Sequence, residues 1–170
     1  MTTTDTKTRI MDCAEALILE QGFAGTSVDA ILERVCLTKG AFFHHFPSKQ
    51  ALAQALVERF ADADATLLET TMARAEHLSR DPAQQLLIFV GLLEERAVEL
   101  AAPHPGCLFA SYCYEAELFG EEIHGVIHGS FVHWRERLAG KFRAAFERRA
   151  PRLEADPADL ADMLNVVAEG

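Results

Sequence analysis

The feature that most constrains this chain is a helical spacing of apolar residues along its whole length. Side chains that recur every three or four residues line one face of an α-helix, whereas a half-buried strand needs strict alternation, which no window here shows. A first helix is expected from about Asp5 to Gln21, with Gly22 placed to stop it, and a long helix is expected after Gly120. The sequence therefore predicts an all-α fold.

Composition places the chain among ordinary globular proteins. Of its 170 residues, 49% are hydrophobic and 25% are charged, which suffices to bury a core. The apolar runs are shorter than the roughly 18 residues that cross a bilayer, and residues 1–10 are too polar for a signal peptide. The four cysteines lack the spacing of a zinc finger or a disulfide framework. We therefore expect a cytoplasmic protein with no membrane contact and no cofactor.

The charge of the chain is unevenly distributed. Its net charge of −10 argues at first sight against a nucleic-acid partner. However, residues 1–50 carry −1, which leaves −9 for residues 51–170. The segment 34–57 holds no Asp or Glu, and it includes Lys39 and Lys49. The sequence thus predicts one local stretch of positive potential in an acidic protein.

Residues 26–50 have the layout of a helix-turn-helix. A short helix capped by Thr26 or Ser27 and a second one capped by Thr38 are joined by a tight segment around residues 35–37, and Ser48 is expected to cap the helix that follows. The second short helix would lie in the major groove of DNA. Thr38 and Ser48 offer hydroxyl groups and first-turn amides that suit phosphate oxygens.

This segment resembles the DNA-binding signature of the TetR family of bacterial repressors. The resemblance rests on residues 26–31 and 37–52. It implies a three-helix helix-turn-helix domain at residues 1–50 and a helical-bundle domain for effector binding and dimerisation at residues 51–170. Because the last helix is still apolar where the sequence stops at Gly170, that helix is expected to be incomplete. The same resemblance implies a homodimeric repressor that binds a palindromic operator in double-stranded DNA and leaves it when a small molecule binds.

The resemblance also implies which residues touch DNA. Those expected on phosphates are Ser27, Thr38, Phe43, His44 and Lys49, and those expected nearest the bases are Lys39, Gly40, Ala41 and His45. Two positions depart from the family pattern: Phe43 stands where Tyr is usual, and Cys36 stands where the turn commonly has Gly. Aromatic residues at helical spacing usually pack, so Phe23, Phe42 and Phe46 are expected in the core of the small domain.

The helical body is expected to bind an apolar or aromatic effector. The predicted pocket residues are Phe60, Leu67, Phe89, Leu93, Cys107, Phe109, Tyr112, Cys113 and Phe119. Residues 107–119 are apolar nearly all round, which predicts a helix buried in the middle of a bundle. The sequence leaves open whether these side chains line a cavity or close a solid core.

Two apolar stripes are expected to contact a second copy of the chain. They comprise Ile127, Phe131, Trp134, Leu138 and Phe142 on the long helix, and Met163 and Val167 on the last helix. The alternative is that both stripes pack inside one bundle.

Other functions were weighed against this one. Cys107 stands at an expected helix N-terminus, where the thiolate is stabilised, so a repressor that senses electrophiles or oxidants through this thiol is one alternative. A helical interaction module without DNA binding is another. His124 and His128 stand four residues apart without further ligands nearby, so no metal site is predicted. The sequence has no phosphate loop and no hydrolase motif, so no enzyme is expected.

Overall fold

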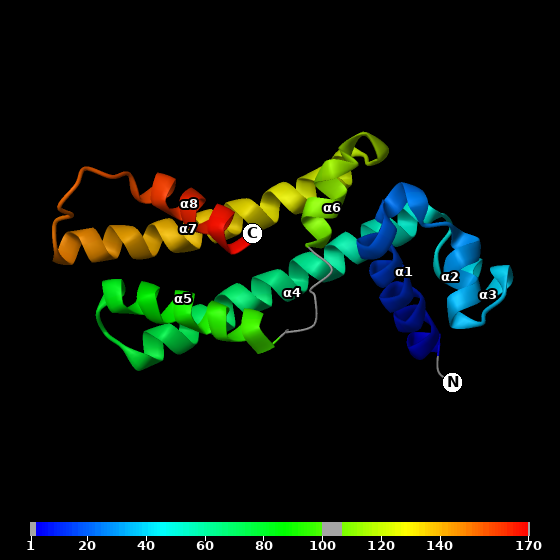
Figure 1. The fold of residues 1–170 in the computed structure, drawn as a ribbon, viewed down its shortest axis with the longest axis horizontal. Helices are drawn as coiled ribbons and strands as arrows, with labels where there is room; N and C mark the ends of the chain where they lie inside the picture. The colour runs from blue at the N-terminus through cyan, green and yellow to red at the C-terminus, as the bar shows by residue number, and fades with distance from the viewer. Residues whose placement is uncertain (1–2, 100–106, 170) are drawn as a thin grey trace. The chain divides into compact units, whose positions relative to one another are not determined.

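The computed structural model of the chain describes residues 3–99 and 107–169, and every regular element in these ranges is a helix (Figure 1). In chain order the helices are α1 (Thr3–Gly25), α2 (Val28–Val35), α3 (Lys39–His45), α4 (Lys49–Leu78), α5 (Pro82–Glu99), α6 (Leu108–Tyr114), the 3₁₀-helix η1 (Ala116–Leu118), α7 (Glu121–Arg148) and α8 (Pro157–Glu169). The predicted all-α fold is confirmed. Within the described ranges, no helix is both long enough and apolar enough to cross a bilayer.

The expected stop at Gly22 is a break inside α1. Gly22 has φ 78° and ψ 166°, and the helix resumes for a last turn that ends at Gly25. Only glycine adopts these angles readily, because a Cβ atom would clash with the backbone. A Cβ atom on Gly22 would also lie 3.2 Å from each carboxylate oxygen of Glu115. The break therefore requires glycine for its backbone angles and for the space that Glu115 occupies.

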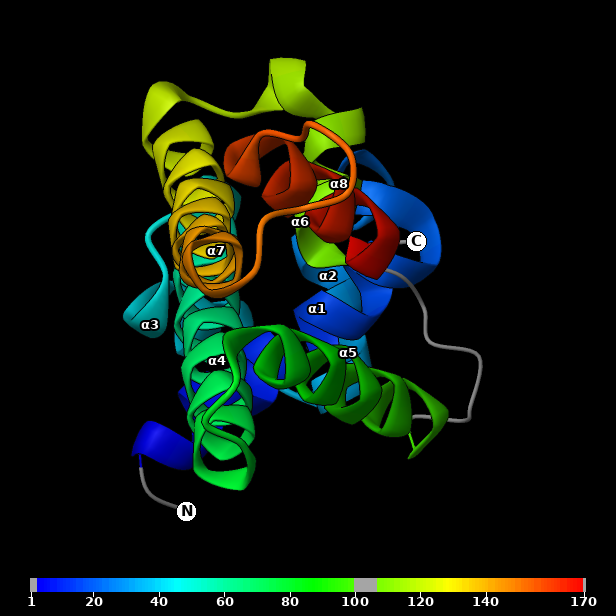
Figure 2. The ribbon, with the colours of Figure 1, turned by 90° about the vertical axis from the view of Figure 1, so that its left-hand side faces the viewer.

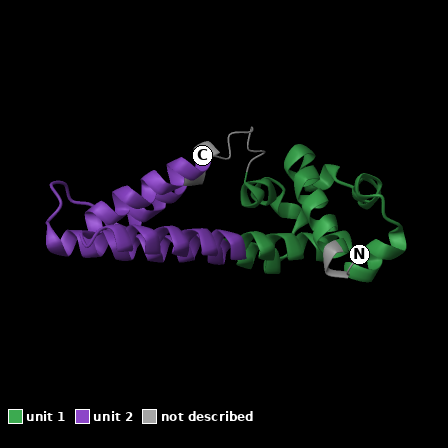
Figure 3. Ribbon diagram, turned by 90° about the horizontal axis from the view of Figure 1, so that it is seen from below, with its two compact units in different colours: residues 1–61, 105–127 green, residues 62–104, 128–170 purple. Residues whose placement is uncertain are grey.

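The chain forms two compact units (Figure 3). Unit 1 comprises residues 1–61 and 105–127, and unit 2 comprises residues 62–104 and 128–170. Both α4 and α7 contribute residues to both units. The division into domains at residue 50 stays a prediction.

The core of unit 1 gathers side chains from α1, α2, α3, α4, α6 and α7. Its largest fully buried members are Tyr112, Phe42, Phe109, Ile10, Ile18, Ile31, Leu52, Leu56 and Leu108. Phe23 and Phe46 belong to the same core, which confirms that these rings and Phe42 pack inside the protein. The hydroxyl of Tyr112 donates to the carbonyl oxygen of Ala53 at 3.3 Å, and burial raises the pKa of this hydroxyl.

The prediction of one buried helix over residues 107–119 is wrong. The segment forms the short helix α6 and then η1, and α6 packs against α1. Leu108 and Tyr112 are buried, whereas Tyr114 is 90% exposed. In so short a helix, one face covers α1 and the other remains in solvent, so apolar residues on both faces do not make the whole helix buried.

Unit 2 has a separate core. It contains Leu68, Met72, Ala75, Leu86, Phe89, Leu138, Ala139 and Ala161, from α4, α5, α7 and α8. Asp64 of α4 accepts hydrogen bonds from the Ser130 hydroxyl at 2.8 Å and from the Trp134 indole at 2.7 Å. Glu76 accepts from Lys141 and Arg137, and these hydrogen bonds lower the pKa of Glu76. Polar contacts thus join α4 to α7 beside the apolar core.

Candidate nucleic-acid interface

The two short helices α2 and α3 begin at side-chain caps. The Ser27 hydroxyl oxygen accepts from the Ala30 amide at 3.0 Å, and the Thr38 hydroxyl oxygen accepts from the Ala41 amide at 3.3 Å. Capping uses these hydroxyl groups only as acceptors, so each O–H can still donate to a phosphate oxygen. Both residues are exposed, as that role requires.

The turn between α2 and α3 is formed by Cys36. Its φ of 55° and ψ of 49° are left-handed, and its amide donates to the carbonyl oxygen of Glu33 at 3.3 Å. Among the residues that the structure describes, no other non-glycine residue has a positive φ. The left-handed conformation costs a side-chain-bearing residue roughly 1–2 kcal/mol relative to glycine, which is why this position favours Gly. The turn geometry is nevertheless that of a helix-turn-helix.

Helix α3 has a buried face and an outer face. Phe42 is fully buried and Phe46 nearly so, which anchors α3 on α2 and α1. The outer residues Thr38, Lys39, Gly40, Phe43 and His44 are exposed, and Ala41 and His45 are half-buried. The outer face therefore combines small residues, which let a backbone approach base edges, with donors for phosphate and bases.

Two cations of this region, Arg34 and Lys39, are paired with acids from outside the segment 34–57. Lys39 Nζ lies 2.8 Å from Asp29 Oδ1, and Arg34 Nη1 lies 3.1 Å from Glu20 Oε2. The segment 34–57 contains no acidic residue, but in the folded protein acidic residues of α1 and α2 lie next to two of its cations. All four side chains are at least half exposed, and exposed pairs contribute only about 0–1 kcal/mol, so phosphate oxygens can compete with these carboxylates.

Lys49 has an intramolecular role. Its ammonium group donates to the carbonyl oxygen of Phe23 and lies 4.0 Å from the centre of the Phe23 ring. Burial lowers the pKa of Lys49, and the nearby carboxylate of Glu115 opposes this shift. Lys49 thus joins the start of α4 to the break in α1, and its contact with phosphate stays a prediction.

Glu115 is a residue that the sequence did not reveal. Its carboxylate accepts from the amides of Phe23 and Ala24, the second at 3.0 Å, although it lies more than ninety positions away. Because the helix breaks at Gly22, these two amides need an acceptor other than the carbonyl oxygens of the preceding helical turn. The glycine signalled that an acceptor was needed, but nothing in the sequence indicated which residue would supply it.

A comparison with known protein families agrees with the capped helices, the left-handed turn and the small residues on the outer face of α3. Residues 10–56 match the family described as bacterial regulatory proteins, tetR family. The chain carries the DNA-binding domain of the TetR family. It is therefore a transcriptional regulator whose helix-turn-helix binds DNA, which rules out an interaction module without DNA binding. Regulators of the TetR family are not enzymes.

Individual TetR-family relatives match most of the chain. The transcriptional regulator AcuR of Cereibacter sphaeroides is 27% identical over 153 residues, which are 90% of this chain and 68% of AcuR. The transcriptional repressor DhaR of a Mycobacterium species is 25% identical over 96% of this chain and 79% of its own length. A TetR-family regulator from Agrobacterium tumefaciens has the same fold, with a TM-score of 0.77, 23% identity, and coverage of 97% of this chain and 84% of that one.

The predicted effector-pocket residues are divided between the two units. In unit 1, the Phe60 and Phe109 rings are 4.7 Å apart, and Tyr112 stacks on Phe119 at 4.3 Å. Cys107 is half-buried beside them, and Cys113 is exposed. In unit 2, Phe89 is fully buried, Leu93 packs against the same core, and Leu67 is half-buried. That these side chains line an effector pocket stays a prediction.

The predicted interface residues differ in exposure. Ile127 and Leu138 are buried in the chain's own cores, and Trp134 and Phe142 are partly buried in unit 2. Phe131 is 36% exposed, Met163 is 65% exposed and Val167 is 76% exposed. Contact with a second copy stays a prediction, and it now depends mainly on α8.

Proposed function

We propose that this TetR-family regulator is a repressor that binds a palindromic operator as a homodimer and releases it when a small effector binds. The observation that carries the proposal is the outer face of α3. It is held outward by buried Phe42, and it presents the exposed residues Thr38, Lys39 and Gly40 at the N-terminal end of the helix. N-terminal residues of a recognition helix are those that reach base edges in the major groove.

The residues around this face divide by role. Lys39, Gly40, Ala41 and His45 would lie nearest the bases, while Ser27, Thr38, Phe43, His44 and Lys49 would lie along the phosphates. The capping hydroxyl groups of Ser27 and Thr38 support this division, since both are exposed and retain a free donor. For Lys49, a phosphate contact would compete with the Phe23 carbonyl oxygen that it now binds.

A homodimer is supported by the exposed apolar face of α8. Met163, Val166 and Val167 are all at least 65% exposed, and their spacing places them on one side of the helix. Contiguous exposed apolar surface is costly in a monomer and typical of an interface. A two-fold dimer presents two copies of α3 to the two halves of a palindrome.

Operator binding is tested by mobility shift with the DNA upstream of the chain's own gene. We expect saturable retardation that weakens as salt rises, because phosphate contacts release counterions. Lys39→Ala is expected to weaken binding about tenfold, which corresponds to roughly 1.4 kcal/mol.

Asp29→Asn is expected to strengthen binding up to about fivefold, since it frees Lys39 and removes a negative charge near the phosphates.

The control for Asp29→Asn is Glu147→Gln, which removes an exposed acid from α7 of unit 2. It changes the net charge equally and is expected to leave the affinity unchanged. The proposed interface would be contradicted if the parent protein does not retard the DNA even at low salt, or if Asp29→Asn and Glu147→Gln change the affinity equally.

A thiol-sensing repressor is a second candidate, favoured by the position of Cys107. This residue is the N-cap of α6, and the C-cap of the same helix is Glu115, whose carboxylate accepts from the amides at the break of α1. Addition of the Cys107 thiolate to the double bond of N-ethylmaleimide would place a bulky group at the start of this short helix. We expect that Cys107→Ser abolishes release of the operator by N-ethylmaleimide, while Cys36→Ser and Cys113→Ser do not. Unchanged release from the Cys107→Ser protein would exclude the thiol mechanism.

A further inference from the structure

We propose that the effector is a small carboxylate, which binds in unit 2 between Arg74 of α4 and Arg96 of α5. The role as effector rests on the proposed function, whereas binding of the carboxylate does not. Neither arginine belongs to the residues that the sequence predicted for the effector.

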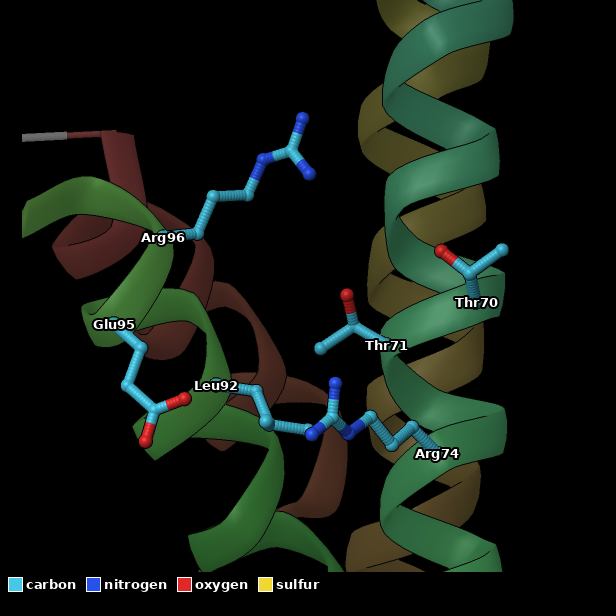
Figure 4. Close-up of a pocket in the computed structure, with 6 residues that line it drawn as sticks. All are labelled: Thr70, Thr71, Arg74, Leu92, Glu95 and Arg96. Atoms are coloured by element: carbon cyan, nitrogen blue, oxygen red, sulfur yellow. The ribbon is translucent and has the colours of Figure 1, made fainter. Parts of the chain in front are cut away.

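The site is a pocket between two diverging helices. After the turn at residues 79–81, α5 diverges from α4 (Figures 1 and 2). The pocket has a volume of about 300 Å³, at the lower end of the range for ligand sites, which suits a small molecule. Its lining residues are Thr70, Thr71, Arg74, Leu92, Glu95 and Arg96 (Figure 4).

The two arginines reach into this pocket from opposite sides. Arg74 extends from α4 toward α5, and Arg96 extends from α5 toward α4 (Figure 4). Within the described part of the chain, neither guanidinium group has an ion-pair partner, whereas two other arginines of unit 2 are paired. Arg137 pairs with Glu69 and Glu76, and Arg135 pairs with Asp162. Two unpaired cations that face one opening repel each other, and an anion between them converts this repulsion into attraction.

The charge of the pocket favours a singly charged ligand. Glu95 lines the same pocket, and its side chain leaves α5 in a different direction from that of Arg96 (Figure 4). Its carboxylate reduces the positive charge of the pocket from two units to one. A carboxylate, with one negative charge, matches this balance better than a phosphate dianion does, and its two oxygens fit the paired donors of a guanidinium group.

The remaining lining residues indicate what the carboxylate is attached to. The Thr70 hydroxyl donates to the Thr66 carbonyl oxygen of its own helix at 2.7 Å, so its donor is already used. Thr71 has no such bond within the described residues, and its hydroxyl group is available to a carboxylate oxygen. Leu92 and the threonine methyl groups provide the apolar contacts. The preferred ligand is therefore a carboxylate with a short apolar group, which adds a negative charge to the apolar or aromatic effector that the sequence suggested.

Binding is tested with propanoate and benzoate as probes, and with propanamide and benzamide as their neutral counterparts. The ligands are titrated into the 170-residue protein without DNA, and binding is followed by calorimetry. Emission of Trp134, the only tryptophan in the sequence, gives a second readout, because its ring lies 6.0 Å from that of Phe89 on α5. We expect at least one carboxylate to bind at least about tenfold more tightly than its amide, since a charge-assisted hydrogen bond is about twice as strong as a neutral one.

Variants then assign the site. Arg74→Gln and Arg96→Gln are each expected to weaken carboxylate binding about tenfold or more, because each removes one charged donor pair. Arg143→Gln, which neutralises an exposed arginine of α7, is expected to leave it unchanged. The comparison of each acid with its amide uses only the parent protein, so it tests whether binding requires the carboxylate even where a substitution impairs folding.

Three results would overturn the inference. The first is that neither carboxylate binds at concentrations up to about 10 mM, where a site with a millimolar Kd would be mostly filled. The second is equal binding of acids and amides, and the third is tighter binding of inorganic phosphate than of either carboxylate. Arginine-dependent binding that leaves the operator complex intact would overturn the role as effector. The proposed function fails separately, when the ligand-free parent does not retard operator DNA.

Discussion

Gly22→Ala is expected to lower the free energy of unfolding of unit 1 by about 3 kcal/mol. Two physical terms contribute. Holding alanine at φ 78° and ψ 166° costs roughly 1–3 kcal/mol, because these angles are almost restricted to glycine. The new methyl group would also lie 3.2 Å from the Glu115 carboxylate, which must then move and leave the amides of Phe23 and Ala24 unpaired. Chemical denaturation followed by circular dichroism measures the change.

The chain offers a control of opposite sign. Gly125 lies within α7 in unit 1, and a Cβ atom added there meets nothing within 4 Å. Gly125→Ala is therefore expected to stabilise the protein by roughly 0.5–1 kcal/mol, because alanine loses less entropy in a helix than glycine does. Destabilisation by Gly22→Ala no greater than about 0.5 kcal/mol would show that the break in α1 needs no glycine.

A double-mutant cycle separates the two terms. If alanine at position 22 displaces Glu115, then Glu115→Gln is expected to cost less in the Gly22→Ala protein than in the parent. Contacting residues typically show coupling energies of about 0.5–3 kcal/mol. If the losses of unfolding free energy from the two substitutions simply add, then the backbone strain destabilises the protein independently of the Glu115 carboxylate.

The second large effect concerns two adjacent phenylalanines of α3. Phe42→Ala is expected to lower the free energy of unfolding by about 3–5 kcal/mol, since it empties a fully buried site. Phe43→Ala is the matched substitution, because the Phe43 ring is 53% exposed. It is expected to change stability by no more than about 0.5 kcal/mol. Thermal denaturation of both proteins tests the contrast.

The same pair tests the interface. Phe43→Ala is expected to weaken operator binding in a protein that is still fully folded, because its ring belongs to the outer face of α3. Phe42→Ala is expected to abolish binding through loss of the folded unit, and added salt or higher DNA concentration is not expected to restore it. Equal stability losses from the two substitutions would contradict the assignment of the two faces.

Local features of this protein were predictable because they depend on neighbours in the chain. Caps were predicted at Thr26 or Ser27, at Thr38 and at Ser48, and the hydroxyl oxygens of Ser27, Thr38 and Ser48 each accept from the amide three residues later. A stop of the first helix was predicted at Gly22, where the structure has a break that one further turn follows. The family was recognised from residues 26–52, whose caps, turn and buried aromatics all act over a few positions.

Features that join distant segments were not predictable. The acids that face Arg34 and Lys39 precede the acid-free segment, so the sequence suggested more free positive charge than the folded protein presents. The carboxylate of Glu115 reaches α1 across ninety-one intervening positions, and no local pattern identifies such a partner.

The helices of this protein, their caps and the helix-turn-helix were determined by the sequence itself, because periodicity and capping are properties of short segments. Only the tertiary structure decided which cations remain unpaired, which apolar residues are exposed, and where a pocket opens. These properties depend on which side chains meet after packing. Hence the outer face of α3 was predictable, whereas the pocket between Arg74 and Arg96 emerged only when α4 and α5 were placed together.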